Sequence, residues 1–320
     1  MMYMNYNYIK QLREILSVTG WPQERLAGEI GVTFAALNRW INKRAVPHKT
    51  AQKLIYNLYK EKVGILPVDV SALNILFGRI DANRKKYKNV VEVFRDNQNV
   101  RDEFLLELTY NSDAIEGSTL TKKETEAVIF DKSKIENRTL IEHLEASNHA
   151  AVLERIFNGE CNDVINEDLL KGLHRAIMQG IRHDAGMYSK FHRAIRGVDL
   201  IMPAPEDIQE EMDVLFKVIN YKEKKTNTGC EGLIAHVAKM HASFEAIHPF
   251  GDGNGRIGRL IMIIQLLSEG YAPCVVENSC KGEYYEVLEY AQKRSETALI
   301  KFVAEAVLKG YKLLEKYEGR

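Results

Sequence analysis

Residues 248–259 read HPFGDGNGRIGR and combine one histidine, one aspartate, four glycines and two arginines in twelve positions. A tight turn needs one or two glycines, and a surface helix needs none. This composition therefore predicts a loop whose backbone another group approaches closely, followed by a helix that begins near Asn254.

The glycines and arginines of this stretch predict an anion-binding site. Gly251, Gly253 and Gly255 allow positive φ, so that successive N–H groups can converge into a nest. The positive N-terminal end of the following helix adds to the same place. Arg256 and Arg259 are three residues apart and share one helix face, which suits a polyphosphate better than a single carboxylate.

The remaining residues of the stretch indicate phosphate-transfer chemistry. Asp252 would repel a phosphate unless a divalent cation bridges them, and Mg²⁺ is ordinarily held by one carboxylate and the substrate phosphates. His248 is placed to accept a proton from an incoming hydroxyl. Phe250, the one bulky apolar residue of the loop, is expected to anchor it in the core. Together they predict transfer from a nucleoside triphosphate to a hydroxyl by in-line attack.

The stretch resembles the signature of Fic (filamentation induced by cAMP) domain proteins, HPFx(D/E)GNGRxxR, at every specified position. The resemblance implies a mostly helical core and transfer of AMP from ATP to a Ser, Thr or Tyr hydroxyl of a target protein. It assigns the general base to His248 and the Mg²⁺ ligand to Asp252. The other positions assigned to nucleotide binding are Phe250, Gly251, Gly253, Asn254, Gly255 and Arg256, with Arg259 at the γ-phosphate.

A second motif, SDAIEG, occupies residues 112–117. Helical spacing runs to Ile115, Gly117 is a good helix stop, and residues 121–124 fit a capping box for the next helix. Glu116 then lies on the last turn of a helix, where the helix dipole disfavours an acid. Its position indicates a specific partner.

SDAIEG resembles the inhibitory motif (S/T)xxxE(G/N) of one class of Fic proteins, through Ser112, Glu116 and Gly117. The resemblance implies that Glu116 pairs with Arg259 at the γ-phosphate position and turns ATP away from its productive pose. Such a carboxylate–guanidinium pair, shielded from water, competes directly with a phosphate oxygen. An additional role for Glu116, positioning a water for removal of AMP, stays open.

The first sixty residues carry nine Lys or Arg and three Glu. Within them, PQERLAGEIGVTFAALNRWINKRAVP places an apolar stripe before Gly31, and Thr33 can cap a second helix. This segment resembles the helix-turn-helix of Cro- and repressor-like DNA-binding proteins. A small helical domain that packs or contacts another protein is the alternative. The residues that would contact DNA are Asn38, Arg39, Asn42, Lys43 and Arg44. Such modules ordinarily bind as dimers, and the sequence leaves a homodimer open.

The one strand-like region lies between residues 190 and 205, and residues 186–212 resemble the flap of the Fic family. The flap is a hairpin that pairs with a target segment as an added strand. Ser189 stands where family members often carry Arg, and a plain hairpin covering the core is the alternative. The predicted target-binding residues are Ile195, Arg196, Gly197, Val198, Asp199 and Leu200.

Apolar residues recur every three to four positions through the rest of the chain, which predicts an all-α protein with this one small β-hairpin. The predicted organisation is a helix-turn-helix domain at 1–62, a helical connector at 63–99 and a Fic domain at 100–312, whose inhibitory helix spans about 100–117. The segments with helical spacing are 139–157, 166–179, 206–220, 231–246, 254–268 and 282–310.

The overall composition limits the possible partners and cellular location of the protein. Lys plus Arg and Asp plus Glu both number 44, so any basic surface must be local. Four separated cysteines without a CxxC pair predict reduced thiols and no zinc site. The N-terminus lacks signal-peptide features, and the longest apolar run, 260–267, is too short to cross a bilayer. A cytoplasmic protein without membrane contact is the prediction.

These observations together predict a Mg²⁺-dependent protein adenylyltransferase that uses ATP and is held inactive by Glu116. Two alternatives stay open. The same site could remove AMP or transfer a different phosphate-linked group. The protein could instead be a DNA-binding regulator whose nucleotide site only senses its ligand.

Overall fold

The computed structural model describes residues 8–64, 68–161, 164–192, 202–220, 229–293 and 295–317. Within these ranges the chain forms fifteen α-helices and one short 3-10 helix, and no β-strand. The all-α prediction is confirmed. The predicted flap residues 195–200 lie outside the described residues. No described helix is both long and apolar enough to cross a membrane.

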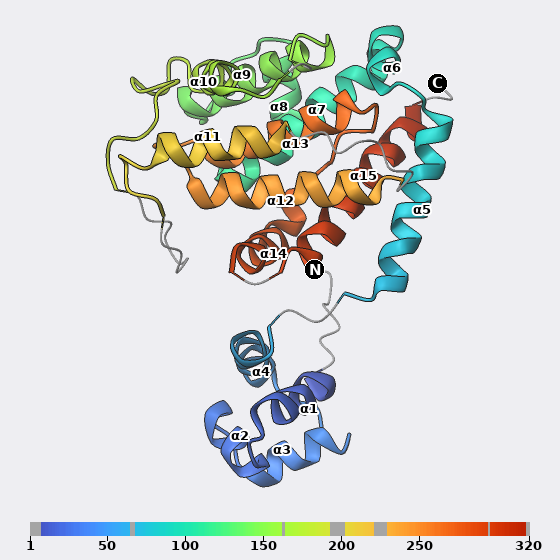
Figure 1. Ribbon diagram of the computed structural model, residues 1–320, viewed down its shortest axis with the longest axis vertical. Coiled ribbons are helices and arrows are strands. Elements are labelled where there is room, and N and C mark those ends of the chain that lie inside the picture. Colours follow the sequence, from blue (N-terminus) through green and yellow to red (C-terminus); the bar gives the residue numbers. More distant parts are fainter. Residues whose placement is uncertain are drawn as a thin grey trace. The chain divides into compact units, whose positions relative to one another are not determined.

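The chain divides into two compact units, residues 1–67 and residues 68–320. Four helices build the first unit (Figure 1). These are α1 (Tyr8–Thr19), α2 (Gln23–Ile30), α3 (Phe34–Ile41) and α4 (Lys49–Lys62). One apolar face of each helix turns inward, as amphipathic helices require. The buried core of the unit consists of Leu12, Ile15, Leu26, Ala27, Ile30, Leu37, Trp40, Ile41, Ala51, Ile55 and Tyr59.

A tight turn joins α2 to α3. Gly31 ends α2 with φ 73°, a left-handed conformation that glycine adopts without steric cost. Thr33 caps α3 by accepting a hydrogen bond from the N–H of Ala36 at 3.3 Å. The helix stop and the helix start predicted from the sequence therefore form at these two residues.

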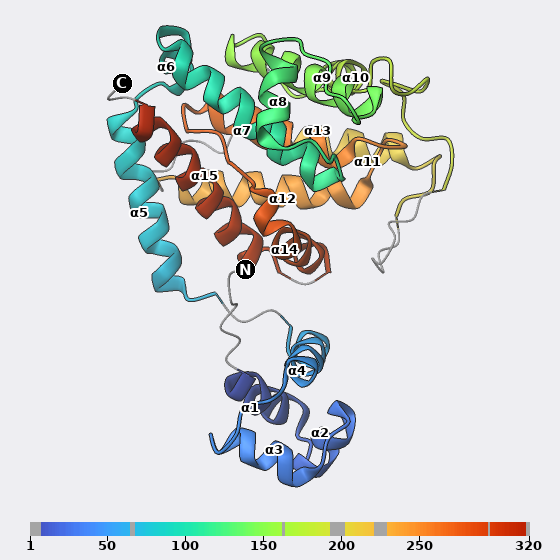
Figure 2. The same cartoon turned by 180° about the vertical axis from the view of Figure 1, so that it is seen from behind.

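Eleven α-helices and the 3-10 helix η1 build the second unit (Figures 1 and 2). They are α5 (Val70–Lys86), α6 (Val90–Asp96), α7 (Gln98–Glu116), α8 (Lys122–Ile129), α9 (Leu140–Phe157), α10 (Glu167–Ile177), α11 (Ile208–Ile219), α12 (Glu231–Ile247), α13 (Asn254–Ser268), η1 (Asn278–Cys280), α14 (Lys281–Lys293) and α15 (Thr297–Tyr317).

Helices α12 and α13 form the centre of the second unit. Helix α12 packs against α11, α13, α14 and α15, and α13 also contacts α7 and α10. Thirteen of the fifteen residues of α13 are buried, as expected of a helix covered on all sides. The start of α13 is therefore held rigidly, with α7 and α10 beside it.

The predicted connector, residues 63–99, largely packs into the second unit. Helix α5 lies along α15 and buries Leu73, Phe77 and Ile80. Its Asp81 side chain accepts a hydrogen bond from the N–H of Cys230 at 3.0 Å, just before α12. From residue 68 onward these residues belong to the compact unit that carries the HPFGDGNGRIGR stretch.

Residues 282–310, which show helical spacing in the sequence, form two helices. Helix α14 ends at Lys293 and α15 begins at Thr297. The Ser295 hydroxyl accepts a hydrogen bond from the N–H of Thr297 at 3.4 Å, a short side-chain contact that starts a new helix. Because both helices bury apolar residues with the same spacing, periodicity alone does not reveal the break.

Candidate functional sites

The loop between α12 and α13 begins with an unusual backbone conformation. His248 follows α12 with φ 50° and ψ 57°, and its N–H donates to the carbonyl of Phe244 at 2.9 Å. A left-handed conformation at a residue other than glycine costs on the order of 1–2 kcal/mol and persists where surrounding contacts enforce it. The chain turns sharply here, which fixes the direction of the His248 side chain.

The loop is anchored by Phe250 and clamped by Asn254. The Phe250 ring is fully buried and stacks on the ring of His174, with centroids 3.8 Å apart. The Asn254 side chain accepts from the N–H of Phe250 and donates to its carbonyl, both at 2.9 Å. The family resemblance also counts Phe250 among the nucleotide-binding residues, but its buried ring can act only by holding the loop.

His174 is a supporting residue that sequence reasoning did not select. Its Nδ1 accepts a hydrogen bond from the N–H of Gly186 at 2.8 Å, so Nε2 carries the proton and donates to the carbonyl of Asp252 at 3.0 Å. Burial lowers its pKa to about 4, which keeps the ring neutral at pH 7. No local pattern marks this histidine, because its partners lie 12 and 78 residues away.

The predicted nest of three glycines with positive φ is wrong. Only Gly253 is left-handed, with φ 78°. Gly255 lies in the first turn of α13, where a Cβ atom would overlap Oε1 of Glu116. At Gly251 a Cβ would come within 3.1 Å of the side chains of Arg182 and Asp184. Gly255 is therefore required for space, Gly251 lies in a tight but adjustable contact, and the first N–H groups of α13 remain as the anion-binding element.

Asp252 extends from the same loop toward solvent. Its side chain is 53% exposed, and its Oδ1 accepts a hydrogen bond from the N–H of Gly253 at 2.6 Å. No group of three or more His, Cys, Asp or Glu that could hold a metal occurs among the described residues. A divalent cation here would need oxygen ligands from a bound phosphate, which is the usual mode of Mg²⁺.

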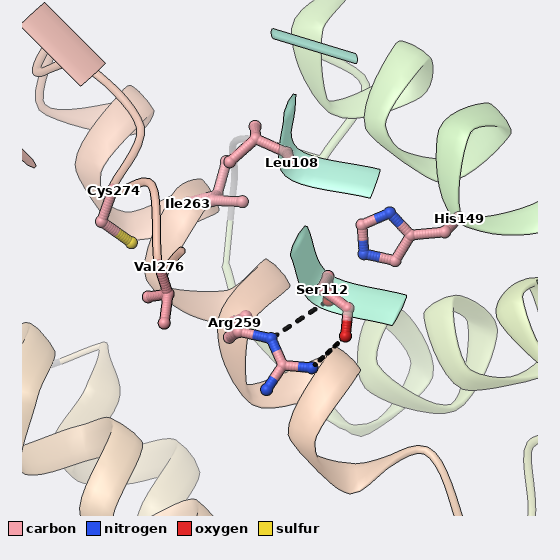
Figure 3. A pocket seen from close by; sticks show the side chains of 7 residues that line it. All are labelled: Leu108, Ser112, His149, Arg259, Ile263, Cys274 and Val276. Atoms are coloured by element: carbon pink, nitrogen blue, oxygen red, sulfur yellow. Dashed lines mark hydrogen bonds between the residues drawn. The ribbon is translucent and has the colours of Figure 1, made fainter. Parts of the chain in front are cut away.

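Arg259 is buried, and its guanidinium bonds to Ser112 of α7 (Figure 3). Its Nη2 donates to Glu116 Oε1 at 2.7 Å and to the carbonyl of Ser112 at 3.1 Å, and its Nε donates to the Ser112 hydroxyl at 3.1 Å. Gly117 ends α7 with φ 112°. Burial opposes the charge of Arg259, but the Glu116 carboxylate outweighs it and raises the pKa of the guanidinium. The structure thus brings together all three residues of the predicted inhibitory motif and Arg259.

Arg256 is covered by a second acid, Glu145 of α9. Its Nη1 donates to Glu145 Oε1 at 2.7 Å, and only 3% of its side chain is exposed. Asp113 of α7 is also buried nearby, with neither carboxyl oxygen hydrogen-bonded within the described structure. Burial raises the pKa of Asp113 to about 7, against the opposing charge of Arg256. Sequence reasoning missed both acids.

Residues 164–266 match the model of the Fic/DOC family. The chain contains a Fic domain. It is 28% identical over 233 residues to the protein adenylyltransferase Fic of Nematostella vectensis, covering 72% of this chain and 53% of that protein. The protein of the same name from Aedes aegypti is 25% identical over 234 residues, covering 72% of this chain and 45% of that protein. The chain thus spans about half the length of these relatives.

Solved structures share the fold of the chain. A Fic domain-containing signaling protein from Bacteroides thetaiotaomicron superposes with a TM-score of 0.64 at 23% identity, covering 77% of this chain and 98% of that one. Residues 134–508 of Fic-1 from C. elegans superpose with the same TM-score at 19% identity, covering 98% of each chain. At these identities the likeness establishes the fold alone.

A small cavity in the second unit borders Arg259 of the Fic domain (Figure 3). His149 lines it and contacts the Thr109 hydroxyl through Nδ1 at 3.2 Å. Burial lowers the pKa of His149 to about 3, so the ring is uncharged at neutral pH. The other residues around the cavity are Leu108, Ser112, Ile263, Cys274 and Val276. None of these side chains carries a charge, and the acid hydrogen-bonded to Arg259 is Glu116.

The residues predicted to contact DNA lie at the C-terminal end of α3 and just after it. Asn38 is partly buried and donates to the side chain of Gln23 at 3.3 Å. Arg39 is exposed on α3. The helix ends at Ile41, before the last three predicted residues. The remaining three predicted residues are exposed in the following turn, and they are Asn42, Lys43 and Arg44.

Proposed function

We propose that the protein is a protein adenylyltransferase that transfers AMP from ATP to a Ser, Thr or Tyr hydroxyl of a target protein. The observation that carries this proposal is the start of α13, where free backbone N–H groups, Arg256 and Arg259 adjoin a loop bearing Asp252 and His248. Relatives named protein adenylyltransferase Fic support it at 25–28% identity.

In the proposed reaction, the target hydroxyl oxygen attacks the α-phosphorus of ATP. A new oxygen–phosphorus bond forms, the bond to the bridging oxygen of the β-phosphate breaks, and pyrophosphate leaves. His248 accepts the hydroxyl proton. The first N–H groups of α13 and Arg256 hold the phosphates and offset the charge that builds on the leaving group. Asp252, exposed in the loop, would hold Mg²⁺, which supplies further charge neutralisation when bound.

We further propose that Glu116 restrains this activity. Its carboxylate accepts a hydrogen bond from Nη2 of Arg259 at 2.7 Å. A γ-phosphate would contact the same nitrogen. Gly255 has no Cβ, and this lets the carboxylate approach the first turn of α13. ATP in its productive pose must therefore displace a charge-assisted hydrogen bond between the buried guanidinium of Arg259 and the Glu116 carboxylate, whose side chain is 28% exposed.

The decisive experiment incubates the wild type, Glu116→Gly and Glu116→Gly/His248→Ala with Mg²⁺, cell lysate and ATP labelled at the α-phosphate. We expect faint labelling of protein by the wild type, strong labelling by the single variant and none by the double variant. Glu154→Gln, an exposed acid on α9, is the matched control and should label like the wild type. Absence of label with every variant would contradict adenylyl transfer and favour AMP removal or ligand sensing.

For the first unit, we propose binding of duplex DNA through α3 and the turn that follows it. Residues 31–60 contain six Lys or Arg and neither Asp nor Glu. Arg39, Lys43 and Arg44 are exposed on this segment. A local basic surface on an otherwise neutral chain is suited to phosphate contacts at a groove edge.

Fluorescence anisotropy with a labelled duplex of mixed sequence, measured as a function of salt, tests this second proposal. Lys43→Ala/Arg44→Ala should weaken binding and lower the slope of log K against log salt by about 2, one for each lost phosphate contact. Arg25→Ala on α2, whose guanidinium lies near Glu29, is the control and should leave the slope unchanged. Equal slopes for the double variant and the wild type would instead favour a protein partner.

A further inference from the structure

Glu245 is a buried carboxylate that the proposed reaction leaves without a role. It lies on α12, one turn before His248, and is 6% exposed. Its Oε2 is 3.6 Å from Nδ1 of His248. That nitrogen is buried, with no hydrogen-bond partner in the described structure, although 23% of the His248 side chain is exposed. The exposed edge of the ring therefore presents Nε2.

The packing of α12 on α13 makes room for this carboxylate. A Cβ atom at Gly258 would come within 2.5 Å of Glu245 Oε1 and within 2.8 Å of the ring of His241. Only glycine at this position of α13 leaves room for the Glu245 side chain. Any larger residue would push the carboxylate out of line with His248.

The groups around Glu245 favour its charged form. Its neighbours are His248 and His241 on α12 and Arg259 on α13, while Tyr284 of α14 contacts Nε2 of His241 at 2.7 Å. Burial raises the pKa of Glu245, but the neighbouring His248 and the charge of Arg259 outweigh it and leave the pKa below its usual range. Burial also lowers the pKa of His241 to about 4, so that ring stays neutral. An anion therefore lies behind His248 at neutral pH.

We propose that Glu245 is a positioning residue for His248, a role that rests on the proposed adenylyl transfer. It holds the tautomer with the proton on Nδ1, leaves Nε2 free to accept the proton of the target hydroxyl, and stabilises the imidazolium that results. A separation of 3.6 Å is longer than a hydrogen bond, and contacts of this kind shorten when charge develops on the ring. Carboxylate–histidine pairs act in this way in hydrolases of unrelated folds.

The activity test uses Glu116→Gly as the parent and adds Glu245→Gln, which keeps the side-chain shape and removes the charge. We expect kcat for labelling from α-labelled ATP to fall about 100-fold or more, with an unchanged KM for ATP. The acid limb of the pH–rate profile should move to lower pH, because the imidazolium loses its stabilising anion. Glu231→Gln, an exposed acid on the same helix, should leave both quantities at parental values.

A merely structural role for Glu245 predicts a different result. Lower kcat with an unshifted pH profile, or a parallel rise in KM, would overturn the assignment. Substitution of His248 by Ala in the parent should abolish labelling, and adding Glu245→Gln to it should change nothing further. This non-additivity is expected of two residues that act as one unit.

Nitrogen-15 NMR of the histidine rings separates failure of this inference from failure of the proposed function. The His248 signals, identified by their loss in His248→Ala, should show the proton on Nδ1 in the wild type and a shift toward the other tautomer in Glu245→Gln. This readout requires no activity. A proton on Nε2 in the wild type would contradict the role of Glu245 even if labelling occurs, and a parent that does not label would contradict only the proposed function.

Discussion

The two units carry guanidinium and ammonium groups in opposite settings. In the second unit, Arg256 and Arg259 are buried, and a glutamate from another helix lies 2.7 Å from each. In the first unit, Arg39, Lys43 and Arg44 are exposed, and no ion pair with a carboxylate is seen for them within residues 8–64. The two arginines of the second unit are thus already paired with carboxylates, whereas the basic side chains of the first unit face solvent.

The difference determines how each unit would meet a polyanion. A buried cation must be paired, so a ligand of α13 must first displace a carboxylate of the protein itself. An exposed cation is open to any polyanion, but salt screens the attraction. Under the proposed function, ATP binding to the second unit would therefore be opposed by the protein's own carboxylates, whereas polyanion binding to the first unit would depend on ionic strength.

The chain provides a simple means of observing each unit separately. Both of its tryptophans, Trp21 and Trp40, lie in the first unit. Tryptophan fluorescence in an unfolding experiment therefore follows the first unit alone, and far-UV circular dichroism follows the helices of both. A substitution in the second unit should change the unfolding transition seen by circular dichroism and leave the tryptophan fluorescence transition unchanged.

The largest expected effect comes from removing a partner of a buried arginine. Glu145→Ala leaves Arg256 buried without its 2.7 Å contact and should lower the free energy of unfolding of the second unit by about 3 kcal/mol. Chemical denaturation followed by circular dichroism measures this loss. Glu154→Ala, on the exposed face of α9, is the control and should cost less than about 0.5 kcal/mol. A loss as small as the control's would mean that Asp113 takes over the pairing.

The next effect concerns pH and Asp113. Its pKa is about 7 in the folded protein, against 3.8 for an aspartate surrounded by water, so between these values the folded chain holds a proton that the unfolded chain has released. The stability that this group contributes therefore falls as pH rises through that window, by about 4 kcal/mol at 1.36 kcal/mol per pKa unit. The difference in unfolding free energy between the wild type and Asp113→Asn should show this slope.

Taking the difference between the two proteins is essential to this measurement. Burial lowers the pKa values of His149, His174 and His241, so their contribution to stability rises with pH over part of the same window. These contributions are common to both proteins and cancel in the difference. A flat difference curve would show that Asp113 is ionised throughout and shares Arg256 with Glu145.

The smallest effect on stability is expected at the exposed basic surface. Arg39→Ala should change the unfolding transition reported by tryptophan fluorescence by less than about 0.5 kcal/mol, because the side chain is exposed and supports no buried group. The same substitution should lower the salt slope of duplex binding by about 1. A large loss of stability would contradict the contrast between the two units.

Local features were predictable from the sequence because their causes lie within a few residues. The Thr121–Glu124 capping box, the end of α7 at Glu116 and the start of α13 at Asn254 all form as their residue patterns indicate. The first boundary is set by side-chain hydrogen bonds to the backbone three residues away, and the other two by left-handed glycines, Gly117 and Gly253. The position of Glu116 beside Arg259 was not local, and its prediction depended on family resemblance.

The sequence by itself determined the all-α class, most helix boundaries and the loop of small and charged residues before α13. Only the tertiary structure decided which acid meets which base: Glu145 on Arg256, Glu245 behind His248, and Asp113 buried near both arginines of α13. It also decided that Gly255 and Gly258 serve close approach and not backbone freedom. Helix formation follows from local bonds, whereas the pairing and burial of charges depend on helices far apart in the chain.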